Sequence, residues 1–253
     1  MTSAAMEQGA RVNLRERLII ALDVPDLRTA LDHVDRLGDS VAWYKVGLQL
    51  FSAAGREALT ALSERGKRIF LDLKLHDIPA TVERAIRAFE GLPVSLLTVH
   101  ASGGPEMLAA AAQAARAVSS RPRVLGVTML TSLDGTEIPA LWNPKTGLEE
   151  KVLELASLCQ RSGIDGVIAS PLEIRALRHQ HPAPFLIVTP GVRGPLDASH
   201  DQKRTLSLPE ALAHGADFVV VGRPVLSASD PRAVLASYEA ALAAPPSTER
   251  TGR

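Results

Sequence analysis

Residues 68–79 read Arg-Ile-Phe-Leu-Asp-Leu-Lys-Leu-His-Asp-Ile-Pro, and this stretch decides the predicted fold of the whole chain. It starts as an apolar run, which is typical of a parallel strand that is buried on both faces. Side chains alternate between the faces of a strand, so Asp72 and Lys74 are predicted to share one face, roughly 7 Å apart, while the leucines around them face helices. Asp77 falls in the following turn, and Pro79 suits the first turn of a helix. The stretch therefore predicts a strand that carries charged groups to one end of a sheet.

Other apolar runs of similar length recur along the chain. With the stretch above, the predicted strands are Leu18–Asp23, Val41–Val46, Arg68–Lys74, Val94–His100, Arg123–Thr128, Gly166–Ser170, Phe185–Thr189 and Phe218–Val221. Amphipathic stretches predict helices at Asp26–Leu37, Leu48–Arg65, Ile78–Glu90, Pro105–Val118, Thr146–Ser162, Pro171–His179, Leu208–His214 and Asp230–Leu242. Each predicted strand thus precedes a predicted helix, which makes eight β/α units.

Parallel β/α units form either an open sheet with helices on both faces or a closed barrel. A dinucleotide-binding sheet carries G-x-G-x-x-G after its first strand, but this chain has Asp23-Val24-Pro25-Asp26 there. Closure also removes the unpaired edges of a sheet. We therefore predict an α/β fold, a single-domain (β/α)8 TIM barrel of residues 14–242, with a flexible N-terminus (1–13) and a flexible C-terminal tail (243–253).

The composition argues against several classes of protein. Lys plus Arg and Asp plus Glu number 28 each, and aromatic residues make up only 4%, so neither nucleic acid nor a membrane surface is expected as a partner. The one cysteine, Cys159, excludes an internal disulfide and is predicted to be a small core residue. The first residues lack the apolar core of a signal peptide, and no apolar run reaches the length of a membrane span. A cytoplasmic protein is therefore expected.

Charged residues lie at the ends of the first three predicted strands: Asp23, Lys45, and Asp72 with Lys74. Active sites of barrels lie at the carboxyl ends of the strands. A buried charge is costly unless it is paired, and opposite signs on neighbouring strands supply that pairing. Two interpretations stay open at this point: a ring of structural ion pairs, or a catalytic centre.

Lys74 stands between two carboxylates in the sequence, and these favour its charged ammonium form. A charged lysine is poorly suited to Schiff-base chemistry, which needs a neutral amine, but it can donate a proton or stabilise negative charge. Glycine and arginine follow the last two strands, at Gly191-Val192-Arg193 and Gly222-Arg223, where barrels often bind phosphate. These features predict an enzyme that acts on a phosphate-bearing small molecule.

Several motifs resemble those of the orotidine 5′-phosphate decarboxylase family, in its bacterial type 1 form, over about residues 17 to 242. The strongest is Leu71-Asp72-Leu73-Lys74-Leu75-His76-Asp77-Ile78-Pro79-Ala80-Thr81-Val82. The others are Ile20-Ala21-Leu22-Asp23, Tyr44-Lys45-Val46-Gly47, Thr98-Val99-His100-Ala101, Val127-Thr128-Met129-Leu130-Thr131-Ser132, Thr189-Pro190-Gly191-Val192-Arg193, Asp201-Gln202-Lys203-Arg204 and Val221-Gly222-Arg223-Pro224. The Asp-x-Lys-x-x-Asp core alone is less specific, because related barrels such as 3-keto-L-gulonate 6-phosphate decarboxylase and hexulose-phosphate synthase share it.

The resemblance implies a decarboxylation of orotidine 5′-monophosphate to UMP in pyrimidine biosynthesis, with no cofactor and no metal. The implied catalytic residues are Lys74, which would protonate C6, Asp72 near the departing carboxylate, Lys45 and Asp77. The resemblance implies that Asp23 and Lys45 contact the ribose, and that Asp77 and Thr81 extend into the site of the partner subunit. It also implies pyrimidine contacts for Thr131 and Ser132, and phosphate contacts for Arg193, Gln202, Gly222 and Arg223. The enzyme would be a homodimer with shared active sites, and residues 194–203 would form a lid. Many relatives are expected to have proline directly after the arginine, whereas Gly194 stands here.

Three other functions stay open on the sequence alone. A metal-dependent relative acting on a sugar phosphate would need magnesium near Asp72, and chelators would inhibit it. A Schiff-base aldolase would be trapped by borohydride, and a barrel that only binds a nucleotide would have no reason to hold like charges together.

His76 and His100 are predicted to be structural rather than metal ligands. The other histidines are predicted to be solvated: His33, His179, His181, His200 and His214.

Overall fold

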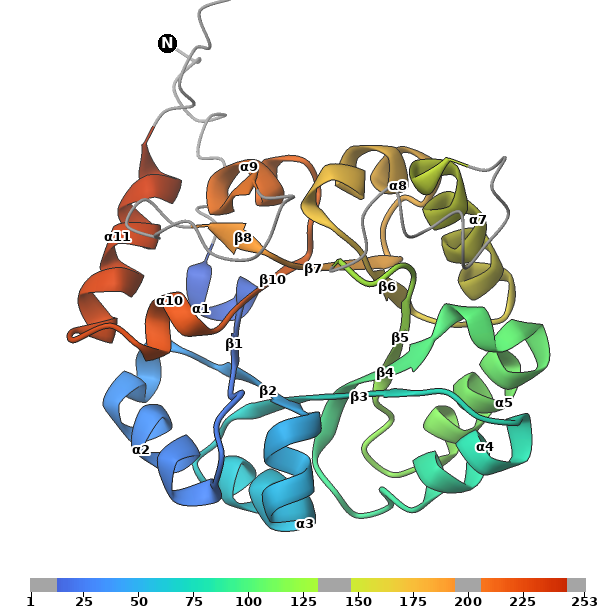
Figure 1. Cartoon of the computed structure of the whole chain (residues 1–253), viewed down its shortest axis with the longest axis horizontal. Helices are drawn as coiled ribbons and strands as arrows, with labels where there is room; N and C mark the ends of the chain where they lie inside the picture. Colours follow the sequence, from blue (N-terminus) through green and yellow to red (C-terminus); the bar gives the residue numbers. More distant parts are fainter. Residues whose placement is uncertain (1–12, 132–146, 194–205, 245–253) are drawn as a thin grey trace, which may run out of the picture.

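The computed structural model describes residues 13–131, 147–193 and 206–244, and Figure 1 shows a ring of strands inside a ring of helices. The strands of the ring are all parallel to their neighbours and close in the order β1-β10-β7-β6-β5-β4-β3-β2. They are β1 (Leu18–Ala21), β2 (Trp43–Gly47), β3 (Arg68–Leu75), β4 (Val94–His100), β5 (Arg123–Val127), β6 (Gly166–Ile168), β7 (Leu186–Pro190) and β10 (Phe218–Val221). The predicted (β/α)8 barrel is therefore confirmed.

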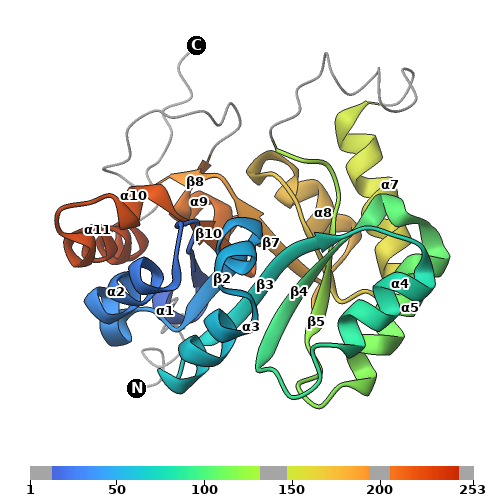
Figure 2. The same ribbon diagram turned by 60° about the horizontal axis from the view of Figure 1, so that its bottom comes forward.

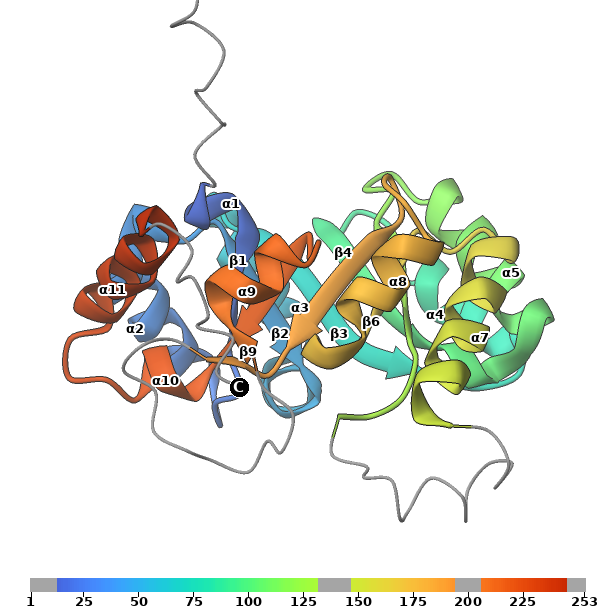
Figure 3. The same cartoon turned by 90° about the horizontal axis from the view of Figure 1, so that it is seen from above.

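The helices outside the barrel follow the predicted order, with bounds that differ by a few residues. They are α2 (Leu27–Leu37), α3 (Leu48–Glu64), α4 (Pro79–Arg87), α5 (Gly104–Ala117), α7 (Leu148–Arg161), α8 (Ile174–Gln180), α9 (Leu208–Ala213) and α11 (Pro231–Ala243), and Figure 3 shows them on either side of the strands. Short elements that were not predicted are α1 (Leu14–Arg17), α10 (Arg223–Leu226), the 3-10 turns η1 (Gly38–Ser40) and η2 (Ala101–Gly103), and the strand pair β8 (Val192–Arg193) and β9 (Leu206–Ser207). The first turn of the helix predicted at Pro171–His179 is the 3-10 turn η3 (Pro171–Glu173), which leads directly into α8. No helix in these ranges has the length and apolar character that a membrane crossing requires.

Two apolar layers stabilise the barrel, because every strand is buried on both faces. The outer layer lies between strands and helices and includes Leu71, with Leu73 and Leu75 packed against it, as predicted for the leucines of β3. The inner layer fills the barrel with Ile19, Ala21, Ala42, Trp43, Phe70, Leu96, Leu125, Leu186, Val188 and Val220. In Figure 2, β3, β4 and β5 run side by side with α4 and α5 outside them. The barrel is thus a packed core and not a channel.

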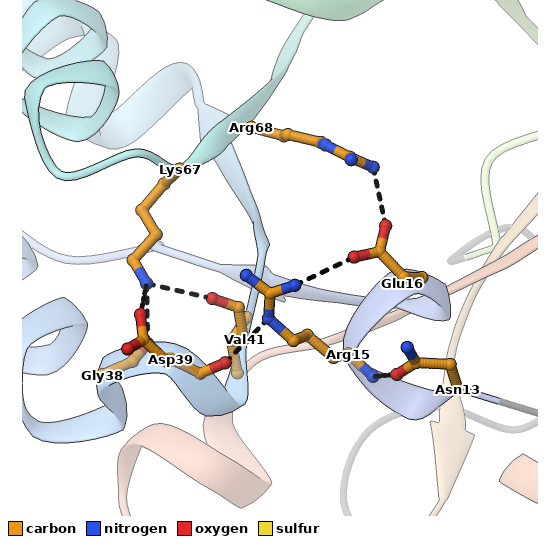
Figure 4. A network of polar contacts seen from close by, with 8 residues as sticks. All are labelled: Asn13, Arg15, Glu16, Gly38, Asp39, Val41, Lys67 and Arg68. Atoms are coloured by element: carbon orange, nitrogen blue, oxygen red, sulfur yellow. Dashed lines mark hydrogen bonds and ion pairs between the residues drawn. The ribbon is translucent and has the colours of Figure 1, made fainter.

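A network of polar contacts joins α1 and η1 to the amino end of the barrel (Figure 4). Arg68, the first residue of β3, donates to Glu16 of α1 at 2.7 Å and lies over the ring of Trp43, 5.4 Å from its centroid. Trp43 in turn meets the Phe218 ring at 5.1 Å. Buried Lys67 donates to the carbonyl oxygen of Gly38 at 2.7 Å. These contacts hold α1 and η1 against the amino end of the barrel and stabilise it.

The predicted tails lie almost wholly outside the described residues. Asn13 caps α1 by accepting from the backbone N–H of Arg15, and α11 ends at Ala243. The lid predicted for residues 194–203 also lies outside the described ranges.

Candidate active site

The side chains that face the barrel interior change from apolar to polar toward the carboxyl ends of β2 and β3. Trp43 belongs to the inner apolar layer, and Lys45 follows it two residues later. Phe70 precedes Asp72 in the same way on β3. Residues two apart share a face of a strand, so each polar side chain lies directly beyond an apolar one. The barrel therefore presents charged groups directly above its inner apolar layer.

Five residues form what we call the mouth cluster: Asp23, Lys45, Asp72, Lys74 and Thr98. Both carboxylate oxygens of Asp72 accept from Lys74 Nζ at 2.9 Å, and Oδ1 also accepts from Thr98 Oγ1 at 2.9 Å. Lys45 Nζ lies 3.6 Å from Asp72 Oδ2 and donates to Asp23 Oδ1 at 3.0 Å. The four charges alternate in sign from β1 across β2 to β3, as the sequence predicted for opposite charges at neighbouring strand ends.

Asp72 is held as a carboxylate even though its side chain is only 10% exposed. Burial raises the pKa of Asp72, but the charges of Lys45 and Lys74 and the hydrogen bonds from Lys74 and Thr98 together lower it further, so the pKa stays below its usual range. The side chain of Lys74 is 30% exposed, against 11% for Lys45. Lys74 is thus the ammonium group of the cluster that a bound molecule reaches more easily.

The backbone at Lys74 departs from the regular strand that was predicted. Lys74 has φ +50°, in the left-handed region that residues other than glycine rarely adopt. The pairing of β3 with β4 shifts register between Leu71 and Leu75. Asp72 and Lys74 do meet, as predicted, but through a local distortion of β3 that strand alternation alone does not describe.

Two residues beside these charges had no predicted role. A Cβ atom on Gly47 would lie 2.8 Å from Lys45 Nζ and 3.0 Å from Asp23 Oδ1, so any larger residue would make the end of the Lys45 side chain shift from its place beside Asp23. Thr98 is fully buried and hydrogen-bonds to Asp72. A signal for Thr98 was present in the sequence, because a polar residue in a strand buried on both faces needs a partner.

Asp77 and Thr81 follow the same strand but lie outside the mouth cluster. Both are exposed, and Asp77 Oδ1 accepts from the backbone N–H of Ile78 at 2.7 Å at the start of α4. Ile78 itself is 66% exposed. Within the described part of the chain, Asp77 has no ion pair with Lys74 or Lys45. One chain by itself therefore does not bring Asp77 to the cluster.

Among the remaining predicted ligands that the structure describes, Gly222 and Arg223 follow β10, which lies with β7 across the barrel from β3, whereas Thr131 follows β5, which only β4 separates from β3 (Figure 1). Gly222 follows β10 and precedes α10, whose first residue, Arg223, is exposed. Thr131 is half-buried after β5. Ser132, Gln202 and the side chain of Arg193 lie outside the described residues. Parallel pairing of β8 with β9 places Arg193 opposite Ser207, so the described residues on the two sides of the segment 194–205 lie next to each other.

His76 and His100 lie side by side next to the mouth cluster, with ring centroids 5.1 Å apart. Burial lowers the pKa of His100, and the nearby His76 and Lys74 lower it further. No group of three or more His, Cys, Asp or Glu side chains in residues 13–131, 147–193 and 206–244 is arranged to hold a metal ion.

The prediction of a solvated His181 is wrong. Its side chain is buried, with Nδ1 2.9 Å from Gln160 Oε1 and Nε2 3.4 Å from Ser157 Oγ, so α7 supplies partners for both ring nitrogens. Cys159 is buried, as predicted, and burial raises the pKa of its thiol to about 12. Neither residue takes part in the mouth cluster.

The sequence of the chain matches a family model described as "Orotidine 5'-phosphate decarboxylase / HUMPS family" over residues 16–238. This range contains every strand of the barrel and every residue of the mouth cluster. The chain belongs to the orotidine 5′-phosphate decarboxylase / HUMPS family.

Relatives in the orotidine 5′-phosphate decarboxylase / HUMPS family align with nearly the whole chain. The orotidine 5′-phosphate decarboxylase of Moorella thermoacetica is 44% identical over 243 residues, which cover 92% of this chain and 96% of the relative. That of Cereibacter sphaeroides is 47% identical over 229 residues, or 90% of this chain and 97% of the relative. A crystal structure of orotidine 5′-phosphate decarboxylase from Lactobacillus acidophilus has a TM-score of 0.78 at 36% identity and covers 90% of this chain and 100% of that one.

Proposed function

We propose that the chain is a carboxy-lyase that converts orotidine 5′-monophosphate to UMP and carbon dioxide without a cofactor, in de novo pyrimidine biosynthesis. The observation that carries this proposal is the Asp72 carboxylate, hydrogen-bonded at 2.9 Å to the Lys74 ammonium at the barrel mouth. The substrate is supported by the relatives from Moorella thermoacetica and Cereibacter sphaeroides, which are named orotidine 5′-phosphate decarboxylase and align over nearly their full length.

In the proposed reaction the bond between C6 and the carboxylate carbon breaks, and its electron pair stays on C6 as carbon dioxide leaves. Lys74 Nζ then gives a proton to C6 and is left as a neutral amine, which regains a proton from solvent. A fixed ammonium group stabilises negative charge that develops on C6 more strongly than it stabilises the neutral carbon of the substrate. Asp72 disfavours the charged carboxylate of the substrate, and this repulsion disappears when neutral carbon dioxide forms.

The other residues have proposed roles in binding. Asp23 and Lys45 contact the ribose hydroxyls, Thr131 and Ser132 contact the pyrimidine, and Arg193, Gln202, Gly222 and Arg223 hold the phosphate. This division is supported by the position of β7 and β10 across the barrel from β3. A dianion bound far from C6 contributes binding energy to closure of the site over the reacting group.

We further propose that the protein is a cytoplasmic homodimer in which each subunit completes the other's site with Asp77 and Thr81. The exposure of both side chains, beside an Ile78 that is 66% exposed, supports this arrangement. In such a dimer the carboxylate of Asp77 would lie near the mouth cluster and stabilise the charged form of Lys74.

The function is tested by following the loss of orotidine 5′-monophosphate absorbance with purified protein, in the presence and absence of EDTA. We expect conversion to UMP with the same rate in both conditions. Loss of activity with EDTA and its return with Mg²⁺ would instead support a metal-dependent reaction. Absence of turnover, together with retained UMP binding, would support a protein that only binds the nucleotide.

Arg223→Ala is expected to weaken binding of UMP by about 10²-fold, since a charge-assisted contact to phosphate contributes roughly 1.5–3 kcal/mol. Binding of uridine should change less than about twofold, because uridine lacks the phosphate that Arg223 contacts in the proposal. Calorimetric titration with the two ligands measures both values. Equal weakening of uridine and UMP would place Arg223 away from the phosphate.

A further inference from the structure

The hydroxyl group of Thr98 joins the two residues on which the proposed chemistry depends. Thr98 lies on β4 and is fully buried. Its Oγ1 donates to Asp72 Oδ1 at 2.9 Å and accepts from the backbone N–H of Lys74 at 2.9 Å. A threonine hydroxyl has one proton and two lone pairs, so these two bonds fix the direction in which it donates. One side chain thus orients both the carboxylate and the backbone that carries the ammonium group.

The pairing of β3 with β4 explains why Lys74 needs this partner. Leu71 pairs with Leu97, and Leu75 pairs with Val99, so Asp72, Leu73 and Lys74 lie opposite Thr98 alone. The extra residues on β3 form a bulge that includes the left-handed Lys74. Such a conformation costs about 1 kcal/mol or more outside glycine and persists only where the surroundings impose it. The hydroxyl of Thr98 satisfies an N–H group that the regular ladder leaves without a carbonyl partner.

We propose that Thr98 is a positioning residue for the proposed decarboxylation. Its single hydroxyl fixes the backbone at Lys74 and the carboxylate of Asp72 relative to each other. Thr98 is buried beneath the mouth and does not reach the substrate, so it acts through these two residues. The inference rests on the proposed function for the reaction, but its geometry can be tested without turnover.

The test compares Thr98→Val, Thr98→Ser and Thr189→Val. Valine has nearly the volume of threonine but neither donates nor accepts, whereas serine keeps the hydroxyl. Thr189 is the matched control because it is equally buried, on β7, and its hydroxyl has no hydrogen-bond partner among the described residues. For each variant, kcat, KM, UMP affinity and the melting temperature are measured. If Thr98→Val does not fold, Thr98→Cys replaces it, because a thiol is only a weak donor and acceptor.

We expect Thr98→Val to lower kcat by about 10²-fold, as displacements near 1 Å do in catalytic sites, with a change in UMP affinity below about threefold. Thr98→Ser should recover kcat to within about threefold, and Thr189→Val should match the wild type. Equal losses in the valine and serine variants would overturn the proposal, as would a normal kcat in Thr98→Val.

The pH dependence gives a readout that a purely structural role would not change. The groups facing Asp72 are Lys45 from β2, Lys74 from β3 and Thr98 from β4, with Asp23 beyond Lys45 and His100 beside Lys74. The Thr98 hydrogen bond helps to lower the pKa of Asp72, so its removal raises that pKa. The acid limb of the kcat/KM profile should therefore move to higher pH in Thr98→Val and return in Thr98→Ser.

Titration of the Asp72 carboxyl carbon by ¹³C NMR separates this inference from the proposed function. If the wild type does not decarboxylate orotidine 5′-monophosphate, the proposed function fails, yet the titration still reports on Thr98. A higher apparent pKa of Asp72 in Thr98→Val supports the coupling. An unchanged titration overturns the positioning role whether or not the enzyme turns over.

Discussion

Lys74→Ala is expected to reduce decarboxylation by a factor on the order of 10⁴ or more, since it removes both a proton donor and a charge that stabilises the transition state. UMP affinity should fall far less, because proton delivery matters mainly in the transition state. Fixed-time assays of UMP formation measure the loss of decarboxylation, and calorimetric titration with UMP measures the change in affinity. Near-normal turnover would show that another group protonates C6.

Lys74→Arg refines this experiment. Arginine keeps the positive charge beside Asp72 but does not release its proton in proteins. We expect Lys74→Arg to bind UMP and to be nearly inactive. Its midpoint of denaturant unfolding should lie closer to that of the wild type than the midpoint of Lys74→Ala does. If arginine restored turnover, Lys74 would act as a fixed charge and not as an acid.

Asp72→Asn is expected to lower kcat/KM by about 10³-fold and to destabilise the fold by about 2 kcal/mol. The amide cannot neutralise Lys45 and Lys74, whose ammonium groups lie 3.6 Å and 2.9 Å from the carboxylate that is lost. A fully buried pair would cost more, but Lys74 is 30% exposed and Lys45 retains Asp23. Urea unfolding gives the stability, and the UMP assay gives the activity.

The loss of stability in Asp72→Asn should depend on pH in a definite direction. The pKa of Asp72 is lower in the folded state than in the unfolded chain, so its contribution is fully present above the unfolded-state value, near 4, and is lost as the pH falls through the folded-state value. The difference between wild type and variant should therefore shrink below about pH 4. Asp35→Asn is the matched control, because Asp35 pairs with Arg65 at an exposed site, where ion pairs contribute little. A similar pH-dependent loss in Asp35→Asn would contradict the assignment to Asp72.

The barrel and most of the mouth cluster could be predicted because both follow from local pattern. Continuous apolar runs mark strands buried on two faces, and alternation by two places Lys45 and Asp72 on the same inner surface beyond Trp43 and Phe70. The pairing of opposite charges then follows from the cost of burying either one alone.

The features that escaped prediction depend on contacts between distant segments. The left-handed Lys74 arises because β3 carries extra residues opposite Thr98, and no pattern within β3 reveals that offset. His181 is buried because α7 places Gln160 and Ser157 beside it, although its own stretch of sequence is polar. The short helices α1 and α10 are too brief to produce a periodic signal.

The filled amino end of the barrel limits the side from which small molecules can reach the charged groups. Trp43 and Phe218 contact each other at that end, and the apolar side chains of the inner layer fill the interior up to Asp72. Among the described residues, this filling leaves the carboxyl end as the side from which Asp72 and Lys74 are reached, so in the proposed reaction the nucleotide, carbon dioxide and the proton that restores Lys74 would all pass on that side. A nucleotide bound on that side would then delay the release of carbon dioxide and the return of a proton to Lys74 until it dissociates.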